Sequence, residues 1–459
     1  MQIKYKLLNF KRFVTEYKFL FSILAGVILF SFIFPLSAQD ISGHSSDTSE
    51  NINSGRTAWM LVSTALVLLM VPGLALFYGG MVRHKNMLNT IILSLACIAV
   101  IGVEWILIGY NMAFGDSIGG IVGWSKGGFG LANIPWNRVE NGVPTLVFVM
   151  FQGKFAIITP ALITGAVAER IKFSSFLIFA LLWSVFIYNP LAHMVWSSGG
   201  WLLQKGILDF AGGTVVHISA GVSALVLVLF FVKSRIGYPE DAIRPSNLIL
   251  TLLGAGLLWV GWFGFNAGSA IATTDDFMLR AGLAFATTQI AASSAALVWM
   301  IIEWIWHGKP TGIGLASGMV AGLVAITPAA GHVEPISALI IGALAGMICF
   351  AGVLLKDKFG YDDTLDVFGV HGIGGIVGAL ATGLFVTIGS EHIGLFVGGD
   401  ATQFMLQLLG VGFGILYAAL GTFIIGFAIH KTLGLRISAK EETLGLDITQ
   451  HGESSFQLR

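Results

Sequence analysis

The sequence predicts an all-α protein that crosses a membrane about eleven times. Three observations predict this fold: 55% of the 459 residues are hydrophobic, only 11% are charged, and long apolar runs follow one another along the chain. Soluble domains average about a quarter charged residues. Lys plus Arg equals Asp plus Glu at 25 each, so there is no basic surplus to attract nucleic acid.

The first 38 residues have the pattern of a signal peptide. Basic residues between positions 4 and 18 precede an apolar stretch at 19–34, and the small residues Ser37 and Ala38 follow. A retained signal anchor is the alternative, because Leu36 is larger than the residue usual at that distance from a cleavage site. In both cases the polar segment 39–56 starts outside the cytoplasm. We expect a membrane domain at 57–431 and a cytoplasmic tail at 432–459.

The candidate spans are identified by length, because about 20 apolar residues are needed to cross a hydrocarbon core of about 30 Å. With the start outside, fourteen Lys and Arg residues fall on the inner side and six on the outer side, as the positive-inside rule requires. We therefore expect a multi-pass protein of the bacterial inner membrane with its tail in the cytoplasm. The expected spans are residues 57–82, 86–113, 144–168, 173–196, 210–232, 247–271, 277–306, 313–330, 336–355, 365–387 and 404–430.

Two stretches of the sequence echo each other. Val216-His217 lies in the fifth expected span and Val370-His371 in the tenth, and each pair is followed by small residues. Spans one to five and six to ten would then form two halves of opposite orientation, with an extra C-terminal helix. Inverted repeats of this kind place the substrate path between the halves.

Both histidines are functional candidates, because an ionisable side chain inside a membrane is costly without a partner or a water-lined path. The alternative is that each is a core histidine bonded to a neighbouring carbonyl. No Cys, Asp or Glu stands at ligand spacing beside His217 or His371, so we expect no metal site and no cofactor. Counted along straight helices, the two imidazoles would lie about 10 Å apart in depth. Contact between them requires the helix starts to dip inward.

Aromatic residues gather near the expected outer ends of several spans. Trp262, Phe265 and Ser269 share one face of the sixth span, Trp196 ends the fourth, and Phe155 lies somewhat deeper on the third. Tryptophans at this depth commonly form an interfacial belt. A converging cluster with one hydroxyl can instead hold a small cation through the ring quadrupoles.

Two aspartates precede the histidines. Asp209 opens the expected fifth helix, where its carboxylate can cap backbone N–H groups or act as a fixed negative charge behind the pore wall. Asp366, five residues before His371, invites the same capping interpretation.

Several longer motifs together resemble the Amt ammonium transporter family of the Amt/MEP/Rh superfamily. The resemblance covers residues from about 57 to 457, and the aromatic cluster favours the Amt branch over the Rh branch. The motifs are Asp209-Phe-Ala-Gly-Gly-Thr-Val-Val-His217, Gly261-Trp-Phe-Gly-Phe-Asn-Ala-Gly-Ser269, Phe151-Gln-Gly-Lys-Phe155, Asp366-Val-Phe-Gly-Val-His371-Gly, Gly445-Leu-Asp and His451-Gly-Glu453.

The resemblance implies a homotrimer with one channel per subunit and a tail that packs on a neighbouring subunit and can meet a PII-type regulatory protein. Two departures from the family pattern stand out: Lys154 beside the gate, and Phe456 where an aromatic hydroxyl is common. The implied roles are an outer ammonium site at Trp196 and Ser269 with Phe155 and Trp262, a gate of Phe155 over Phe265, and a pore containing His217 and His371.

The expected function is ammonium transport for nitrogen uptake. NH4+ would enter the aromatic site, lose a proton at the gate, and cross the pore as ammonia, with or without a following proton. An ammonium sensor that signals through its tail is the alternative. An enzyme is not expected, because no nucleophile–base pair or metal-protease motif lies in the spans.

Overall fold

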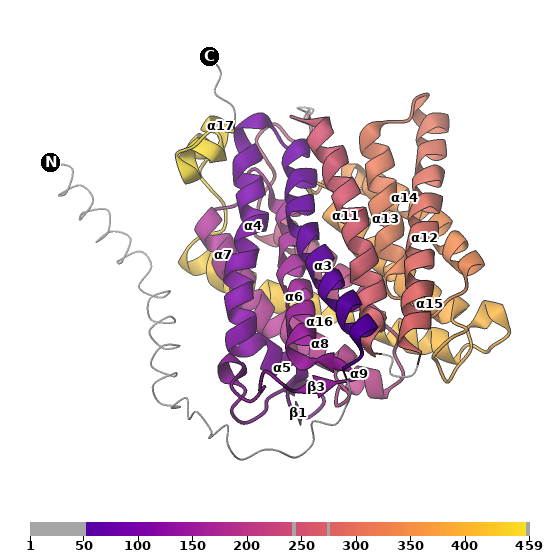
Figure 1. Ribbon diagram of the computed structural model, residues 1–459. Helices are drawn as coiled ribbons and strands as arrows, with labels where there is room; N and C mark the ends of the chain where they lie inside the picture. The colour runs from indigo at the N-terminus through magenta and orange to yellow at the C-terminus, as the bar shows by residue number, and fades with distance from the viewer. Residues whose placement is uncertain (1–51, 241–244, 273–275, 456–459) are drawn as a thin grey trace. The chain divides into compact units, whose positions relative to one another are not determined.

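The computed structural model describes residues 52–240, 245–272 and 276–455. All of them belong to one compact unit, Glu50–Arg459. The expected signal peptide at 1–38 lies outside the described residues, as do most of the polar segment 39–56 and Phe456, so these assignments stay predictions. Figure 1 shows that the described unit is a helical bundle with only short strands.

The described chain contains ten helical segments long and apolar enough to cross a membrane, and an eleventh, shorter apolar helix at Gly312–Ile326. This confirms the prediction of an all-α polytopic membrane protein with about eleven helices. The ten longer segments are Ser54–Met81, His84–Phe114, Thr145–Val167, Phe173–Gln204, Gly213–Phe230, Leu248–Ala272, Phe277–His307, Pro335–Phe359, Phe368–Phe385 and Thr402–Thr432.

Several segments change helix type along their length. π-helical turns interrupt the second and fourth segments and begin the fifth and ninth, widening the helix at those points. In chain order the helices are α3 (Ser54–Met81), η1 (His84–Asn86), α4 (Met87–Glu104), η2 (Trp105–Gly109), α5 (Tyr110–Phe114), η3 (Phe129–Leu131), α6 (Thr145–Val167), α7 (Phe173–Trp183), η4 (Ser184–Tyr188), α8 (Asn189–Trp196), α9 (Trp201–Gln204), η5 (Gly213–Ile218), α10 (Ser219–Phe230), α11 (Leu248–Gly268), η6 (Ser269–Ala272), α12 (Phe277–His307), α13 (Gly312–Ile326), α14 (Pro335–Phe359), η7 (Phe368–Gly372), α15 (Ile373–Phe385), η8 (Leu395–Val397), α16 (Thr402–Thr432), α17 (Ala439–Leu444) and η9 (Asp447–His451).

The two ends of the bundle differ in structure. One end, here called the hairpin end, carries two antiparallel strand pairs: β1 (Ser117–Ile118) with β2 (Val122–Gly123), and β3 (Val139–Glu140) with β4 (Val143–Pro144). The opposite end, the tail end, carries α17 and η9 (Figure 1). α3 and α6 both run from the hairpin end to the tail end.

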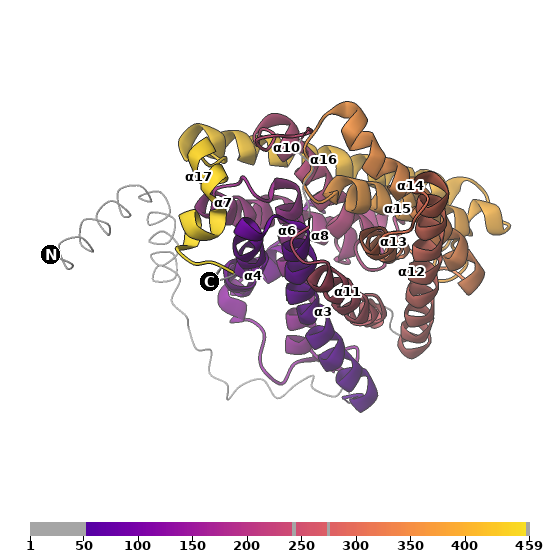
Figure 2. The same ribbon diagram turned by 90° about the horizontal axis from the view of Figure 1, so that it is seen from above.

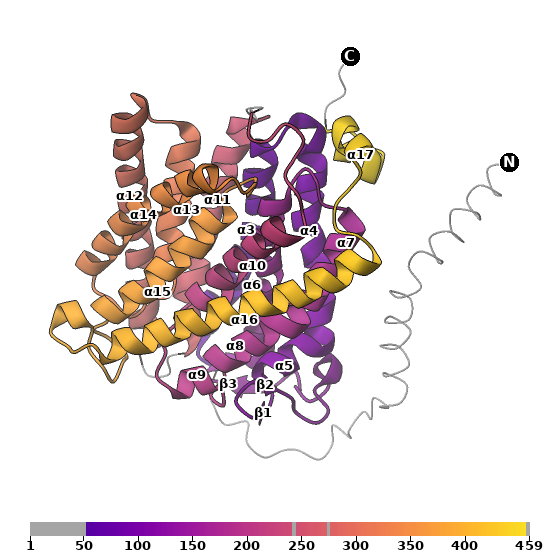
Figure 3. The same ribbon diagram turned by 180° about the vertical axis from the view of Figure 1, so that it is seen from behind.

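The final spanning helix, α16, crosses the bundle and packs on α10 and α15 (Figure 3). It therefore contacts the helix that carries His217 and the helix that follows His371. Each half of the inverted repeat contributes one of these helices, so the extra C-terminal helix holds the two halves together.

The tail packs on loops of its own chain, and Figure 2 shows α17 beside α7 and α4. The Asp447 carboxylate accepts hydrogen bonds from the backbone N–H groups of Leu88 and Asn89 at the start of α4. Glu442 accepts from the N–H of Ile236 at 2.7 Å and pairs with Arg436 at 2.7 Å. The tail thus joins two separate segments of the tail end, the start of α4 and the loop at Ile236.

A buried charge network lies beneath the tail. Arg83 donates to Glu169, and Arg235 lies between Glu169 at 3.4 Å and Asp362 at 2.6 Å. Burial alone would raise the pKa of Glu169, but the hydrogen bond and charge of Arg83 and the charge of Arg235 outweigh it and lower that pKa. The ionised Glu169 carboxylate therefore holds the side chains of Arg83 and Arg235 beside it.

Candidate functional site: a histidine pair between two capped helix starts

The helix that carries His217 begins at Gly213, directly after an aspartate cap. The Asp209 carboxylate is buried, and it accepts four backbone N–H groups at 2.5 to 3.1 Å. These are the N–H groups of Gly212, Gly213, Thr214 and Val215, which a helix start leaves without intrahelical partners. The capping geometry predicted for Asp209 is therefore present.

The helix that carries His371 begins at Phe368, and its cap is not the residue expected. Asp363 accepts from the N–H groups of Val367 and Phe368 at 3.1 and 2.7 Å. Asp366 instead has a positive φ of 59° and pairs with Lys356 at 2.5 Å. The capping interpretation of Asp366 was wrong, because that residue lies in the turn before the helix, where its carboxylate is aimed at the lysine.

The two helix starts approach each other closely enough for only glycine to fit. A Cβ on Gly221 would lie 2.4 Å from Gly372 Cα, and one on Gly375 would lie 3.1 Å from His217 Cβ. This contact brings η5 and η7 together in the middle of the unit, where both histidines are buried.

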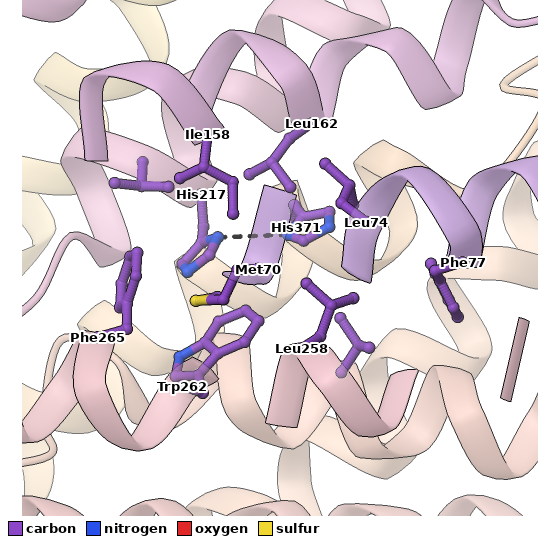
Figure 4. A pocket seen from close by; sticks show the side chains of 12 residues that line it. Met70, Leu74, Phe77, Ile158, Leu162, His217, Leu258, Trp262, Phe265 and His371 are labelled. Atoms are coloured by element: carbon purple, nitrogen blue, oxygen red, sulfur yellow. Dashed lines mark hydrogen bonds between the residues drawn. The ribbon is translucent and has the colours of Figure 1, made fainter. Parts of the chain in front are cut away.

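The imidazoles of His217 and His371 face each other across this contact. Their Nδ1 atoms are 3.2 Å apart, and their rings stack with centroids 5.3 Å apart and planes inclined by 19° (Figure 4). The estimate of a separation of about 10 Å in depth was wrong, because both helices begin three residues later than expected, at Gly213 and Phe368. Capped loops carry the chain inward before each helix starts.

A small cavity adjoins the pair. Its volume of about 10 Å³ is close to that of one water-sized probe, so it accommodates a single small molecule. Nε2 of His217 is buried without a hydrogen-bond partner among the described residues. Apart from the two histidines and Trp262 the lining is apolar, as Figure 4 shows; it consists of Met70, Leu74, Phe77, Ile158, Leu162, Val216, His217, Leu258, Trp262, Phe265, Val320 and His371.

A continuous series of aromatic rings leads from the hairpin end to His217. Phe155 stacks on Phe265 with centroids 4.1 Å apart, and Trp196 meets the edge of Phe155 at 6.0 Å. Phe265 lies 6.2 Å from the His217 ring. The two phenyl rings are buried at 1% exposure, and their contacts link Trp196 to the ring of His217.

Trp196 and Ser269 lie where the aromatic series begins. The indole N–H of Trp196 donates to the Asp209 carbonyl at 2.8 Å, which fixes this ring against the cap of η5. The Ser269 hydroxyl donates to the Phe265 carbonyl at 2.8 Å, so its oxygen lone pairs remain for another hydrogen-bond donor. Trp196 is thus bonded to the residue that caps η5, and Ser269 is bonded to Phe265.

Comparison with known proteins identifies the family of this chain. A model of the Ammonium Transporter Family matches residues 58–456. An ammonium transporter of Aquifex aeolicus (strain VF5) is 48% identical over 412 residues, which cover 89% of this chain and 94% of the relative. The chain belongs to the ammonium transporter family. Among solved structures, Saccharomyces cerevisiae Mep2 superposes with a TM-score of 0.80 at 33% identity, covering 90% of this chain and 93% of Mep2. A structure named Sensor Amt Protein matches with a TM-score of 0.78 at 28% identity, covering 86% and 98%.

One residue assigned to the outer site lies elsewhere in this ammonium transporter family member. Trp262 is buried, its ring stacks on His217 at 5.4 Å, and its indole N–H donates to Thr327 Oγ1 at 2.9 Å. The expected position at the outer mouth was wrong. Seven residues separate Trp262 from Ser269 along α11, and at about 1.5 Å each this places the tryptophan about 10 Å deeper.

The sequence analysis missed Asp363, although a signal for it was present. Asp209 precedes His217 by eight residues, and Asp363 precedes His371 by the same interval. Aligning the two halves on their histidines would have paired these aspartates and identified the second cap. No group of three or more His, Cys, Asp or Glu side chains that could hold a metal ion occurs among residues 52–240, 245–272 and 276–455.

Proposed function

We propose that this protein transports ammonium by binding NH4+ near Trp196 and Ser269 and conducting ammonia past His217 and His371. The observation that carries the proposal is the buried imidazole pair beside a cavity for one small molecule. The unpaired Nε2 of His217 offers ammonia a hydrogen bond where the remaining lining is almost entirely apolar.

The apolar lining supports deprotonation before the pore. Removing a cation from water into a low-dielectric interior costs several kcal/mol, whereas neutral ammonia does not carry that penalty. Potassium cannot lose a proton, so the same lining rejects it. Whether the proton follows the ammonia through the histidine pair is left open by this mechanism.

The proposed recruitment site lies outside the gate of Phe155 and Phe265. The faces of aromatic rings attract a cation with about 0.5 to 2 kcal/mol each, and the Ser269 hydroxyl can accept a hydrogen bond from NH4+. Asp209 acts from behind this site: its backbone carbonyl holds Trp196, and its carboxylate holds the start of η5. Trp262 belongs to the pore below the gate in this proposal.

The positive-inside rule places the tail end in the cytoplasm and the hairpin end outside, in the bacterial inner membrane. The function would be nitrogen uptake by a homotrimer with one channel per subunit. A PII-type protein would meet the tail on the cytoplasmic face, where Glu442 and Asp447 hold it against its own loops.

Solid-supported membrane electrophysiology on proteoliposomes tests the proposal, with ammonium pulses and potassium pulses compared. We expect His217→Ala with His371→Ala to suppress the ammonium current more than it lowers thermal stability. His217→Asp should let potassium pass, because a fixed negative charge offsets part of the cost of desolvating any cation.

His193→Ala provides the matched control for these variants. His193 is also a fully buried histidine, but it bonds Ala113 O at 2.9 Å and Ser117 Oγ at 2.8 Å, away from the cavity. We expect this variant to keep its potassium exclusion and most of its ammonium current. Wild-type ammonium current and intact potassium exclusion in the double alanine variant would show that the pair is only a packing feature.

An ammonium sensor is the second candidate, favoured by the likeness to the structure named Sensor Amt Protein and by the docked tail. Flux distinguishes the two functions. A folded protein that binds ammonium but moves none across a liposome membrane would be a sensor. An ammonium current through the wild-type protein would instead identify a transporter.

A further inference from the structure

The loop between α9 and η5 lies along one face of α16. Gln403, Gln407 and Gly410 are all buried and follow one another at intervals of four and three residues, so they share this face of the helix. A Cβ on Gly410 would lie 2.9 Å from Ile207 Cγ2, which shows how closely the loop approaches α16. The two glutamines therefore meet the backbone of this loop directly.

Gln407 uses its whole side-chain amide in this contact. Its Oε1 accepts from the backbone N–H of Leu208 at 2.8 Å, and its Nε2 donates to the carbonyl of the same residue at 2.7 Å and to the Ala379 carbonyl at 3.1 Å. Gln403 donates to the remaining lone pair of Oε1 at 3.3 Å. An amide offers two donor and two acceptor positions, and here all four are used. The orientation of the amide is thus fixed, since a flipped amide would turn its NH2 group toward the Leu208 N–H.

The partners of Gln407 differ from those of an ordinary polar contact between membrane helices, in which side chains bond across to another helix. Two of its four bonds go to Leu208, a loop residue whose N–H and C=O have no backbone partner within the described residues. Leu208 directly precedes Asp209, whose carbonyl holds Trp196 and whose carboxylate caps η5. Gln407 therefore supports both of these contacts from one residue away.

We propose that Gln407 is a positioning residue for the outer ammonium site. It acts through the loop and not on the substrate: it holds Leu208, so that Asp209 keeps the indole of Trp196 and the start of η5 in fixed relative positions. Its bond to Ala379 on α15 ties the same loop to the other half of the repeat. The inference rests on the proposed recruitment of NH4+ beside this tryptophan.

The measurement is the ammonium concentration that gives half of the maximal current in proteoliposomes, with the maximal current and the thermal midpoint recorded for each variant of the full chain. Gln407→Met keeps the length of the side chain and removes its hydrogen bonds. We expect it to raise the half-saturating concentration about fivefold, which corresponds to the loss of about one hydrogen bond at the site. The maximal current and the exclusion of potassium should stay near those of wild type. Damage to the fold alone would lower the maximal current and the midpoint and leave the half-saturating concentration unchanged.

Two variants on the same helix serve as comparisons. Thr422 is also buried on α16, and its hydroxyl donates to Ser223 Oγ at 2.7 Å, but this bond joins α16 to α10 away from the loop. Thr422→Val should lower the thermal midpoint and keep the half-saturating concentration of wild type. Gln403→Met loses a bond to the Gly206 carbonyl, two residues earlier in the loop, and should raise that concentration by less than Gln407→Met does.

Trp196→Leu separates this inference from the proposed function. A wild-type half-saturating concentration in Gln407→Met overturns the positioning role, and an increase in Trp196→Leu in the same assay would show that the recruitment site nevertheless stands. If Gln407→Met raises the concentration and Trp196→Leu does not, the recruitment site is wrong and the positioning role falls with it. Equal increases in Gln407→Met and Thr422→Val would also overturn the proposal. Should Gln407→Met not fold, Gln403→Met takes its place, and a wild-type value in that variant overturns the proposal.

Discussion

The helices that carry His217 and His371 begin in the same way at opposite ends of the bundle, but their capping carboxylates have different partners. Asp209 accepts four backbone N–H groups, two on each oxygen, and no Lys or Arg in the described part of the chain forms an ion pair with it. Asp363 accepts two N–H groups and lies beside the Asp366–Lys356 pair. Burial and the nearby charge of Asp366 raise the pKa of Asp363 to about 6.

The difference shows what an internal repeat preserves. The interval of eight residues from aspartate to histidine, the π-helical start and the close approach of the helices recur in both halves. The charges around them do not, because the tail end also contains the network of Arg83, Glu169 and Arg235. The backbone geometry of the helix starts is therefore the same in both halves of the repeat. The charges around each start instead depend on the end of the bundle at which it lies.

The largest effect is expected for Asp209→Ala. Four N–H groups would be left in a buried site without an acceptor, and we expect the free energy of unfolding to fall by about 4 kcal/mol. The measurement is thermal unfolding in detergent. Stability equal to that of wild type would mean that water replaces the carboxylate and that the cap is not structural.

Asp363→Ala should cost less, about 2 kcal/mol, because only two N–H groups lose their acceptor. It also removes one of two neighbouring negative charges. The same unfolding assay checks this prediction, with Asp209→Ala measured beside it. A loss as large as that of the first variant would contradict the comparison drawn between the two caps.

Acid should destabilise the tail end specifically. The pKa of Glu169 is lowered from its ordinary value of 4.5, so its pairing contributes stability above that value and loses it as pH falls through the folded-state pKa. We expect wild type to lose more thermal stability than Glu169→Gln between about pH 6 and about pH 3.5, with a difference of about 2 °C in midpoint. If the unfolding midpoints of the two proteins changed with pH in parallel, the ionisation of Glu169 would not contribute to stability in this pH range.

The smallest effect separates the two asparagine variants. Both oxygens of Asp209 accept N–H groups, so Asp209→Asn turns an NH2 group toward two donors and should cost about 2 kcal/mol. Asp363→Asn relieves repulsion with Asp366 and should cost less than about 1 kcal/mol. Unfolding midpoints that rank the variants in the opposite order would refute this distinction.

The sequence predicted the spans well, because hydrophobic length alone identifies a stretch buried in lipid. It placed the starts of the helices that carry His217 and His371 three residues early. Leu365 and Val367 are apolar and looked helical, yet the helix begins only at Phe368, where the Asp363 side chain takes over the backbone N–H groups. The path of the loop determines which aspartate accepts the N–H groups of Val367 and Phe368, and that path cannot be predicted from hydrophobicity alone.

The site was predicted in part for a similar reason. Spacing along the sixth span predicted Trp262, Phe265 and Ser269 on one face, and the rings of Trp262 and Phe265 are in contact, but the spacing did not give their depth relative to other helices. Depth depends on how α11 crosses η5, and only the packed structure brings Trp262 against His217. The roles of these residues in binding and gating stay predictions.

The 3.2 Å contact between the two Nδ1 atoms has a consequence for timing. Two neutral imidazoles in such a contact share a single hydrogen, so one ring is the donor and the other is the acceptor. If a proton entered at Nε2 of one ring and left from Nε2 of the other, the shared hydrogen would shift across and both tautomers would be reversed. The pair would then be set for passage in the opposite direction only. A second proton could follow the first only after both imidazoles had returned to their original tautomers. Each proton transfer would therefore be followed by a separate recovery step.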